Sequence, residues 1–442
     1  MKVLVLGAGV SGRAAARLLA RLGMQYEVYD RSPDSLARLD APDVRLVAGD
    51  WHPELLEGID LVITSPGFAP DSAPMMAAQL EGIPVWSEVE FAARRLECPV
   101  IAVTGTNGKT TVVEQATEML QESGLRAVAA GNIGRAVSDI VLEDWDVVVL
   151  EVSSFQLTYT YSLHPEVAVI VNVAADHLDW HGSEGAYRAA KARIFMHFED
   201  QNLLVFDADD PGAAQLAVAA RGRRAPVVGD GRLRPGTFGM VRDGLVLPSG
   251  TVALAGAPPS DPAYRVNLAL AAVAATEMGA GPGAVGRVVG RFRHGDHRRK
   301  VVAEWDGITW VNDSKATNPH AAVAAVDSYP SVVLIAGGRN KGLDLAPLVA
   351  RPNIRALIAI GESGPELLRK ASGCPSSLAG SLEQAVAMAG RRANAGDTVL
   401  LSPGCASFDM FRSYEERGVV FCRLVWDHID RARAGGGGAV RS

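Results

Sequence analysis

The stretch TGTNGKTT at residues 104–111 combines glycine, lysine and threonine residues in an order suited to binding phosphates. An apolar run at residues 100–103 precedes it and a helix-like stretch follows, which predicts a turn between a strand and a helix. Backbone N–H groups of such a turn bind phosphate oxygens, a lysine supplies positive charge for the outer phosphates, and a threonine hydroxyl can bind Mg²⁺. The usual pattern G-x-x-x-x-G-K-[ST] spaces its glycines more widely, but the parts are the same. The sequence therefore predicts a phosphate loop made of Gly105, Thr106, Asn107, Gly108, Lys109, Thr110 and Thr111.

A second glycine-rich turn, GAGVSG at residues 7–12, matches G-x-G-x-x-G after an apolar stretch at residues 2–6. Asp30 lies at the end of the next predicted strand, where dinucleotide-binding folds carry an acidic residue that binds ribose. Taken alone, this pattern indicates NAD. However, glycines at a helix N-terminus can bind any nucleotide diphosphate, so the pattern predicts a nucleotide and leaves its identity open.

Carboxylate and imidazole groups follow two further apolar runs. Glu151 ends VVVLE, and Asp176 with His177 follows VAVIVNVAA. A buried carboxylate is costly unless it holds a cation, so these three residues, near the lysine turn in sequence, predict a Mg²⁺ site. Lys191, on the helix-like stretch YRAAKARIF, has no spacing that distinguishes it from a solvent-exposed lysine.

The elements that must position these residues alternate between short apolar runs and Ala- and Leu-rich stretches, which is typical of βαβ units around parallel sheets. Ligands bind such sheets at the carboxyl ends of the strands. We predict an α/β protein of three domains. They are an N-terminal Rossmann-like sheet at 1–94, a central P-loop ATPase-like domain at 95–290 and a C-terminal Rossmann-like domain at 291–434, followed by a flexible tail at 435–442.

Composition excludes several classes of protein. The formal net charge of −7 argues against a general nucleic-acid binder or a protein attracted to anionic membranes. The four cysteines form no C-x-x-C pair, which indicates reduced thiols, and Cys405 is interpreted as a small buried residue. No signal peptide and no run long enough to insert into a membrane is evident, so we expect a cytoplasmic protein.

Six segments together resemble, in order and spacing, the Mur ligases of peptidoglycan assembly: TGTNGKTT, EVSSFQL, NVAADHLDWHGS, YRAAKARIF, NDSKATN and LSPGCASFDMF. The resemblance extends over nearly the whole chain. It implies an ATP-dependent amide ligase that adds D-glutamate to UDP-N-acetylmuramoyl-L-alanine through an acyl phosphate and a tetrahedral intermediate. It also implies ATP and two Mg²⁺ ions as cofactors, small-molecule substrates, a monomer, and a role in cell-wall biogenesis, cell shape and cell division.

The resemblance also implies roles for residues of the central domain. Lys109 and Thr111 would contact ATP phosphates, Thr110 and Glu151 would hold one Mg²⁺, and His177 would hold the other. Lys191 matches a family lysine that is carbamylated and supports the second metal. Either Asp176 or His177 would assist proton removal, a choice that the sequence leaves open.

Substrate-binding positions follow from the same resemblance. The first glycine turn would hold the UDP diphosphate rather than NAD, with the uridine end near Asp30, Arg31, Ser65 and Gly67; Val10, Ser11 and Gly12 belong to this turn. Asn132 and Ser153 match positions near the muramoyl group. D-Glutamate would be bound by Lys341, Ser407 and Tyr414 with Phe408 beside them, and the loop next to ATP contains Asp313, Lys315 and Thr317, while Asn267 and Arg298 complete the ATP site.

Two segments depart from the family pattern. The adenine-side motif H-N-x-x-N reads AYRVN, so Ala263 and Tyr264 replace its first two polar residues, which makes the adenine contacts less certain than the phosphate contacts. Lys300 stands where the family usually has a glutamate after the second domain. Three other functions remain open from the sequence: an NAD-dependent oxidoreductase, a nucleotide-binding switch protein without catalytic activity, and a sibling ligase that adds another amino acid.

Overall fold

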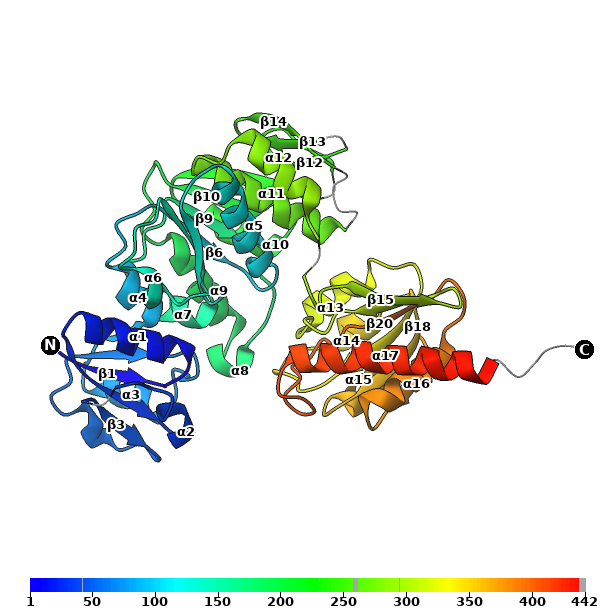
Figure 1. Ribbon diagram of the computed structural model, residues 1–442, viewed down its shortest axis with the longest axis horizontal. Helices are drawn as coiled ribbons and strands as arrows, with labels where there is room; N and C mark the ends of the chain where they lie inside the picture. Colours follow the sequence, from blue (N-terminus) through cyan, green and yellow to red (C-terminus); the bar gives the residue numbers. More distant parts are fainter. Residues whose placement is uncertain (42, 230, 243, 257–260, 294, 437–442) are drawn as a thin grey trace, which may run out of the picture. The chain divides into compact units, whose positions relative to one another are not determined.

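The computed structural model describes residues 1–442 apart from 42, 230, 243, 257–260, 294 and 437–442. The chain divides into two compact units. Unit 1 comprises Met1–Ala175 and Trp180–Phe292, and unit 2 comprises Asp176–Asp179 and Arg293–Ser442. Two β-sheets belong to unit 1 and one to unit 2, each accompanied by helices (Figure 1). The predicted α/β class is confirmed.

The first sheet of unit 1 is parallel, with strand order β3-β2-β1-β4-β5. Its strands are β1 Lys2–Leu6, β2 Gln25–Asp30, β3 Arg45–Ala48, β4 Leu61–Thr64 and β5 Val85–Ser87. Its helices are α1 Val10–Arg21, α2 Pro33–Leu36, the 3-10 helix η1 Pro53–Leu56, α3 Ala73–Leu80 and α4 Glu88–Ala93. The strand order reverses direction at β1, which is where an open parallel sheet forms a ligand-binding crevice.

The second sheet of unit 1 has the order β14-β13-β12-β11-β10-β9-β6-β8-β7. Its strands are β6 Val100–Thr104, β7 Ala127–Gly131, β8 Val147–Glu151, β9 Val167–Ile170, β10 Leu203–Asp207, β11 Arg223–Val228, β12 Phe238–Val241, β13 Gly244–Leu247 and β14 Gly250–Ala253. Its helices are α5 Lys109–Glu122, α6 Val137–Ile140, α7 Ser154–Thr158, α8 Leu178–His181, α9 Glu184–Ala192, η2 Arg193–Phe195, α10 Pro211–Val218, α11 Pro262–Glu277 and α12 Pro282–Arg291. The phosphate-loop strand β6 lies between β8 and β9, so Glu151 ends a strand adjacent to the loop.

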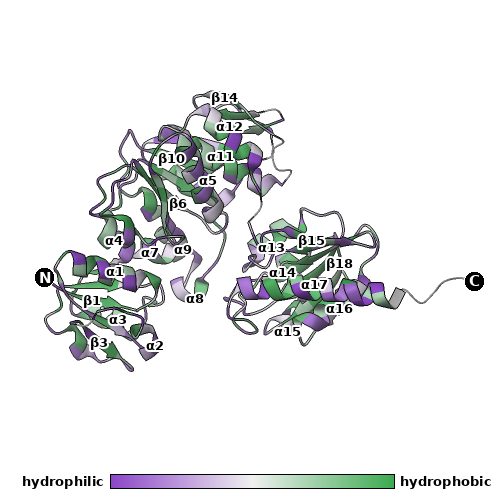
Figure 2. Cartoon of the chain, in the orientation of Figure 1, coloured by the Kyte–Doolittle hydropathy of each residue, from purple (hydrophilic) through white to green (hydrophobic). Residues whose placement is uncertain are grey.

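The sheet of unit 2 has the order β15-β16-β20-β17-β18-β19. Its strands are β15 Lys300–Trp305, β16 Ile308–Asn312, β17 Val332–Gly337, β18 Ile354–Ile360, β19 Ser376–Leu378 and β20 Thr398–Leu401. Its helices are α13 Pro319–Val326, α14 Ala346–Val349, α15 Gly364–Lys370, α16 Leu382–Arg392 and α17 Tyr414–Gly436. Figure 2 shows the strands as mainly hydrophobic and α17 as carrying many hydrophilic residues.

Successive residues of a central strand belong to two different hydrophobic cores. Each core lies on one face of the sheet, so both faces must be covered by helices. In β6, Val100 and Ala102 belong to one core and Ile101 and Val103 to another. The same alternation divides β17 of unit 2 between its two cores. Because side chains of a strand point alternately to opposite faces, a continuous apolar run predicts a strand buried on both faces.

One core joins the two sheets of unit 1. Val3 and Val5 of β1 share it with Val100 and Ala102 of β6. Glu88 reinforces this junction, since its Oε1 accepts a hydrogen bond of 2.6 Å from the backbone of Ser138. Burial is the main cause that raises the pKa of Glu88 to about 7. The first and second sheets therefore pack as one compact unit.

The apolar strands predicted from the sequence are confirmed, and two of the sheets carry additional antiparallel strands at their edges. The strands β12, β13 and β14 form antiparallel pairs, and β15 pairs antiparallel with β16. Helix α17 continues to Gly436, so two residues of the predicted tail are helical, and 437–442 lie outside the described residues. The domain limits at residues 94 and 290 stay predictions.

No helix within the described residues is long and apolar enough to cross a membrane.

Candidate functional site

The phosphate-loop sequence forms the connection from β6 to α5. Gly108 is the N-cap of α5 with φ +84°, a left-handed conformation that favours glycine. A Cβ atom at Gly108 would lie 2.8 Å from the side chain of Asn267. Lys109, Thr110 and Thr111 are the first residues of α5. The loop and helix therefore have the order that the sequence predicted, and the predicted Asn267 packs against the loop.

Two lysine side chains converge on one backbone oxygen of the loop. Lys109 Nζ donates to the carbonyl of Gly105 at 2.8 Å and to that of Thr106 at 3.1 Å. Lys191 Nζ, from α9, donates to the same Gly105 carbonyl at 2.8 Å, although the side chain is only 1% exposed. Nothing in the residues around Lys191 indicates that this side chain is buried, and its role in the site stays a prediction.

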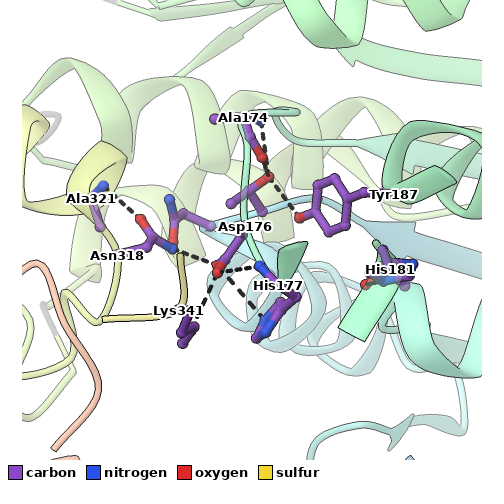
Figure 3. A network of polar contacts seen from close by, with 12 residues as sticks. Ala174, Asp176, His177, His181, Tyr187, Asn318, Ala321 and Lys341 are labelled. Atoms are coloured by element: carbon purple, nitrogen blue, oxygen red, sulfur yellow. Dashed lines mark hydrogen bonds and ion pairs between the residues drawn. The ribbon is translucent and has the colours of Figure 1, made fainter. Parts of the chain in front are cut away.

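Two braces hold the loop in shape, and sequence reasoning assigned a role to neither of them. Asn172 accepts a hydrogen bond of 2.8 Å from the Asn107 backbone N–H and donates one of 3.1 Å to the Asn107 carbonyl. The hydroxyl of Tyr187 lies 2.9 Å from that of Thr106, which also donates to the carbonyl of Ala174 (Figure 3). Tyr187 precedes Lys191 by one helical turn, and the Lys191 ammonium lies 4.6 Å from its ring centroid, a cation–π contact.

Glu151 ends β8 and is 3% exposed. Its Oε1 accepts a hydrogen bond of 2.9 Å from Asn132, whereas its Oε2 is buried and has no hydrogen-bond partner among the described residues. Burial of a carboxylate oxygen that accepts no hydrogen bond is unfavourable unless a cation binds that oxygen. Glu151 therefore fits the Mg²⁺ role predicted for it.

The predicted metal set is otherwise untested. No group of three or more His, Cys, Asp or Glu side chains in the described part of the chain is arranged to hold a metal ion. The predicted set contains only two such side chains, Glu151 and His177, together with Thr110 and Lys191. These assignments stay predictions.

The first glycine turn connects β1 to α1. Gly7 has φ +95°, and a Cβ atom at Gly12 would lie 1.7 Å from the Gly7 carbonyl oxygen, so the helix approaches the strand closely. The two carboxylate oxygens of Asp30 each accept a hydrogen bond from a backbone N–H group, one from Ala8 at 2.7 Å and the other from Ser32 at 2.8 Å. Each oxygen keeps a further acceptor position, so these bonds hold the turn in shape without deciding which nucleotide it binds.

The other residues predicted for the UDP substrate lie at the same edge of this sheet. Val10 begins α1 and is 64% exposed, with Ser11 and Gly12 following it. Arg31 follows β2 and is exposed beside Asp50, and Gly67 lies in the turn after β4. Ser65, in the same turn, has a buried hydroxyl with no hydrogen-bond partner in the part of the chain that the structure describes. It lines a small pocket together with Thr64, Pro66, Phe68, Ser87, Phe155, Gln156, Tyr159 and Trp180. Ser153, at the end of the neighbouring sheet, caps α7 by accepting from the Gln156 backbone.

In unit 2, Asp176 is the centre of a buried polar network (Figure 3). Its carboxylate accepts from Asn318 at 2.9 Å and from Lys341 at 3.3 Å, and from the backbone of His177 at 2.8 Å. Burial acts to raise the pKa of Asp176, but Lys341, His177 and Asn318 outweigh it and hold that pKa below its ordinary value. His177 has φ +52°, a strained conformation that is common at functional sites.

The NDSKATN segment follows β16. Asp313 accepts from the Ser402 hydroxyl at 2.8 Å and from the Arg299 backbone at 3.1 Å, and burial is the main cause that raises its pKa to about 6. The charge of Arg299 and, to a smaller extent, that of Arg298 act to lower that pKa. Thr317 ends the turn by donating its N–H to the Lys315 carbonyl.

Arg417 of α17 ties this segment to the SPGCASFD segment, and sequence reasoning missed it. It is 1% exposed and donates to the hydroxyl and carbonyl of Ser314 at 2.9 and 2.8 Å and to the carbonyl of Cys405 at 3.3 Å. Burial lowers its pKa to about 10 and raises that of the Cys405 thiol to about 11. Cys405 is therefore a small buried residue, as the sequence suggested.

The remaining residues predicted for D-glutamate lie around these loops. Lys315 Nζ lies 5.3 Å from the ring centroid of Tyr414, the first residue of α17. Ser407 is buried and accepts from two backbone N–H groups of the turn that follows it, whereas Phe408 is 65% exposed. The structure thus brings Lys315 to Tyr414 and Lys341 to Asp176.

Tyr264 stands where the adenine-side pattern has a polar residue, and its side chain is buried. It is 6% exposed, and its ring centroid lies 5.3 Å from that of Phe292. Ala263 lies in the first turn of α11 and donates its N–H to the capping residue Asp261 at 2.9 Å. Neither residue offers the amide or imidazole of the family pattern.

Comparisons with family models match three segments of the chain. Residues 1–87 match the model described as "Mur ligase MurD-like, N-terminal domain", residues 103–233 match "Mur ligase middle domain", and residues 297–405 match "Mur ligase, glutamate ligase domain". Each segment contains strands of one of the three sheets.

Curated relatives are similar over nearly the whole chain. Proteins named UDP-N-acetylmuramoylalanine–D-glutamate ligase from Frankia casuarinae and Rubrobacter xylanophilus are each 42% identical to it. The alignments cover 98% of this chain and 95% of the first relative, and 100% of this chain and 99% of the second. A relative of the same name from Pelotomaculum thermopropionicum is 40% identical, over 96% of this chain and 97% of its own.

Solved structures share the fold at low sequence identity. A pseudomurein peptide ligase type C from Methanothermus fervidus has a TM-score of 0.60 and 18% identity, and the alignment covers 97% of this chain and 99% of that chain. MurF from Acinetobacter baumannii has a TM-score of 0.58 and 15% identity, over 97% of this chain and 93% of that chain. On the evidence of its full-length relatives, the chain belongs to the Mur ligase family, on the branch whose curated members are named UDP-N-acetylmuramoylalanine–D-glutamate ligase.

Proposed function

We propose that this protein is an ATP-dependent ligase that joins the amino group of D-glutamate to the alanyl carboxylate of UDP-N-acetylmuramoyl-L-alanine in peptidoglycan precursor synthesis. The observation that carries the proposal is the 42% identity, over 98% of the chain, to a relative named for this reaction. The lysine loop and the half-satisfied Glu151 carboxylate support it, because both suit phosphoryl transfer.

Amide formation in water requires activation of the carboxylate. The alanyl carboxylate would attack the γ-phosphorus of ATP, giving ADP and an acyl phosphate. The D-glutamate amine would then attack the acyl carbon and give a tetrahedral intermediate that expels inorganic phosphate. In the first step, Lys109 and the N–H groups of the loop would hold the outer phosphates and offset the charge on their oxygens.

Glu151 with Thr110, and His177 with Lys191, are proposed to hold two Mg²⁺ ions. When bound, these ions would supply charge neutralisation on the phosphoryl oxygens. Lys191 is proposed to carry a carbamate, although its amine donates to the Gly105 carbonyl in this structure. Nuclear magnetic resonance after exposure to ¹³C-bicarbonate should then show one carbamate signal that is absent from Lys191→Met; the same spectrum for both proteins would reject the carbamate.

Unit 2 is proposed to supply the amino-acid site. Lys341, Thr317, Ser407 and Tyr414, with Phe408 beside them, would bind D-glutamate, and Asp313, Lys315, Arg298 and Asn267 would contact ATP. A carboxylate whose pKa lies below its ordinary value is a weak base, so Asp176 is poorly suited to take the amine proton. At the other end of the substrate, Asn132 and Ser153 would lie near the muramoyl group and the first glycine turn would hold the diphosphate.

The test is phosphate release from ATP and Mg²⁺ with UDP-N-acetylmuramoyl-L-alanine, compared among D-glutamate, L-glutamate, L-lysine and no amino acid. We expect release in proportion to product with D-glutamate only. Release that depends equally on L-lysine would indicate a sibling ligase, and release that ignores the amino acid would overturn the proposal. Size-exclusion chromatography tests the further proposal that the enzyme is a monomer, and cell fractionation tests the proposed cytoplasmic location.

A further inference from the structure

Asn132 lies directly beside the carboxylate that is proposed to hold a metal ion. It follows β7, whose last residue Gly131 is paired with Glu151 at the end of β8. Its backbone N–H donates to the Glu151 carbonyl at 2.9 Å, and its side-chain Nδ2 donates to Glu151 Oε1 at 2.9 Å. The same residue therefore contacts both the main chain and the side chain of Glu151.

Gly131 makes this close contact possible. It has φ +101°, and a Cβ atom there would lie 2.3 Å from the Glu151 carbonyl oxygen. A residue with a side chain would push the two strand ends apart. The chain therefore turns tightly at Gly131 and returns the Asn132 amide onto the carboxylate.

The two oxygens of Glu151 differ in consequence. An ionised carboxylate only accepts hydrogen bonds, so the amide must present its nitrogen to Oε1. Oε2 stays buried and has no partner in the described structure. The contact fixes the rotation of the carboxylate and leaves one defined oxygen for an electropositive ligand.

We propose that Asn132 is a positioning residue for the metal site: it holds the Glu151 carboxylate so that Oε2 is presented to a divalent cation. This inference rests on the proposed function, in which Glu151 binds Mg²⁺. It differs from the role predicted for Asn132 by resemblance, contact with the muramoyl group, because it concerns metal affinity rather than affinity for the UDP substrate.

The experiment measures Mn²⁺ binding to the full-length protein by electron paramagnetic resonance, without nucleotide or UDP substrate. Bound Mn²⁺ that is lost in Glu151→Gln identifies the site. We expect Asn132→Ala and the nearly isosteric Asn132→Leu to bind Mn²⁺ about 10–100-fold more weakly, the usual effect of removing an outer-shell partner. Arg135→Ala is the matched control, because Arg135 lies on the same connection but binds Glu143, and it should leave the affinity unchanged.

A kinetic readout separates the two roles. In the ligase assay, the Asn132 variants should raise the Mg²⁺ concentration needed for half-maximal rate, whether or not the KM for the UDP substrate also rises. Unchanged Mn²⁺ affinity in both variants, or a rise confined to the KM for the UDP substrate, would overturn the inference, as would Mn²⁺ binding that Glu151→Gln does not alter. If wild type binds Mn²⁺ as expected but releases no phosphate with D-glutamate, the proposed function fails instead.

Discussion

The two glycine-rich turns of unit 1 both connect a parallel strand to a helix, yet they are held in shape by different groups. In the first, the Asp30 carboxylate accepts from the Ala8 N–H inside the turn. In the second, the neutral amide of Asn172 binds Asn107 through both its oxygen and its nitrogen. A neutral brace adds no negative charge beside the loop that is proposed to hold several phosphates, whereas a carboxylate is tolerable at the turn that is proposed to bind one diphosphate.

Each turn also has a cation that binds one of its own carbonyl groups. Arg13 donates to the Ala8 carbonyl at 2.7 Å, and Lys109 and Lys191 both donate to that of Gly105. The first turn thus has one arginine and the second has two lysines. We therefore expect the first turn mainly to bind its ligand and the second to take part in catalysis. The four predictions below test this distinction.

The largest effect is expected from removing the lysine. Lys109→Ala should lower kcat by about 10²–10³-fold, since it deletes a preorganised positive group at the phosphates. The matched variant Arg13→Ala should change only the KM for the UDP substrate, by a few-fold. Steady-state phosphate release measures both, and equal losses of kcat would show that the two turns do not differ in this way.

The next effect concerns the folding of the first turn. Gly12→Ala places a methyl group against the Gly7 carbonyl and should destabilise the protein by about 1–3 kcal/mol or more. Gly9→Ala is the control, because no described residue other than its chain neighbours has an atom within 4 Å of a Cβ atom placed there. Thermal unfolding of the two variants should differ clearly; similar midpoints would mean that the close approach at Gly12 is unimportant.

Replacing the neutral amide of Asn172 with a carboxylate tests whether the loop requires an uncharged side chain at this position. Asn172→Asp turns a donor toward the Asn107 carbonyl into an acceptor and adds negative charge at the loop. We expect the KM for ATP to rise about tenfold, which corresponds to about 1.4 kcal/mol, with the KM for the UDP substrate unchanged. If the KM for ATP stays as in wild type, the charge of the brace has no bearing on phosphate binding.

The smallest effect is expected from the reverse change in the first turn. Asp30→Asn keeps one acceptor oxygen, so one of the two backbone donors, Ala8 or Ser32, loses its partner. The loss of one hydrogen bond should cost about 1 kcal/mol of stability and raise the KM for the UDP substrate a few-fold. A change in the KM for ATP instead would contradict the assignment of this turn.

Local pattern was sufficient to predict both turns and the buried strands that lead into them, because glycine spacing and apolar runs express short-range constraints. The antiparallel strands β12–β14 were missed because their sequence lacks a long apolar run. The braces were missed for a different reason. Asn172 lies 65 residues from Asn107, and only the pairing of β6 with β9 brings them together.

Burial was likewise not readable from the sequence. Lys191 sits on an amphipathic helix where a lysine is normally exposed, and only packing against the loop reveals it. The role proposed for Lys191 rests on the resemblance, and the structure adds that its amine lies 2.8 Å from the Gly105 carbonyl oxygen.

Arg417 has a consequence for engineering the loops that are proposed to bind the amino acid. Its buried guanidinium binds both the segment at Ser314 and the segment at Cys405. Grafting one of these segments from a ligase with another specificity, without the other, would leave a desolvated positive charge with too few acceptors. A successful exchange would therefore have to replace both loops and the first turns of α17 together.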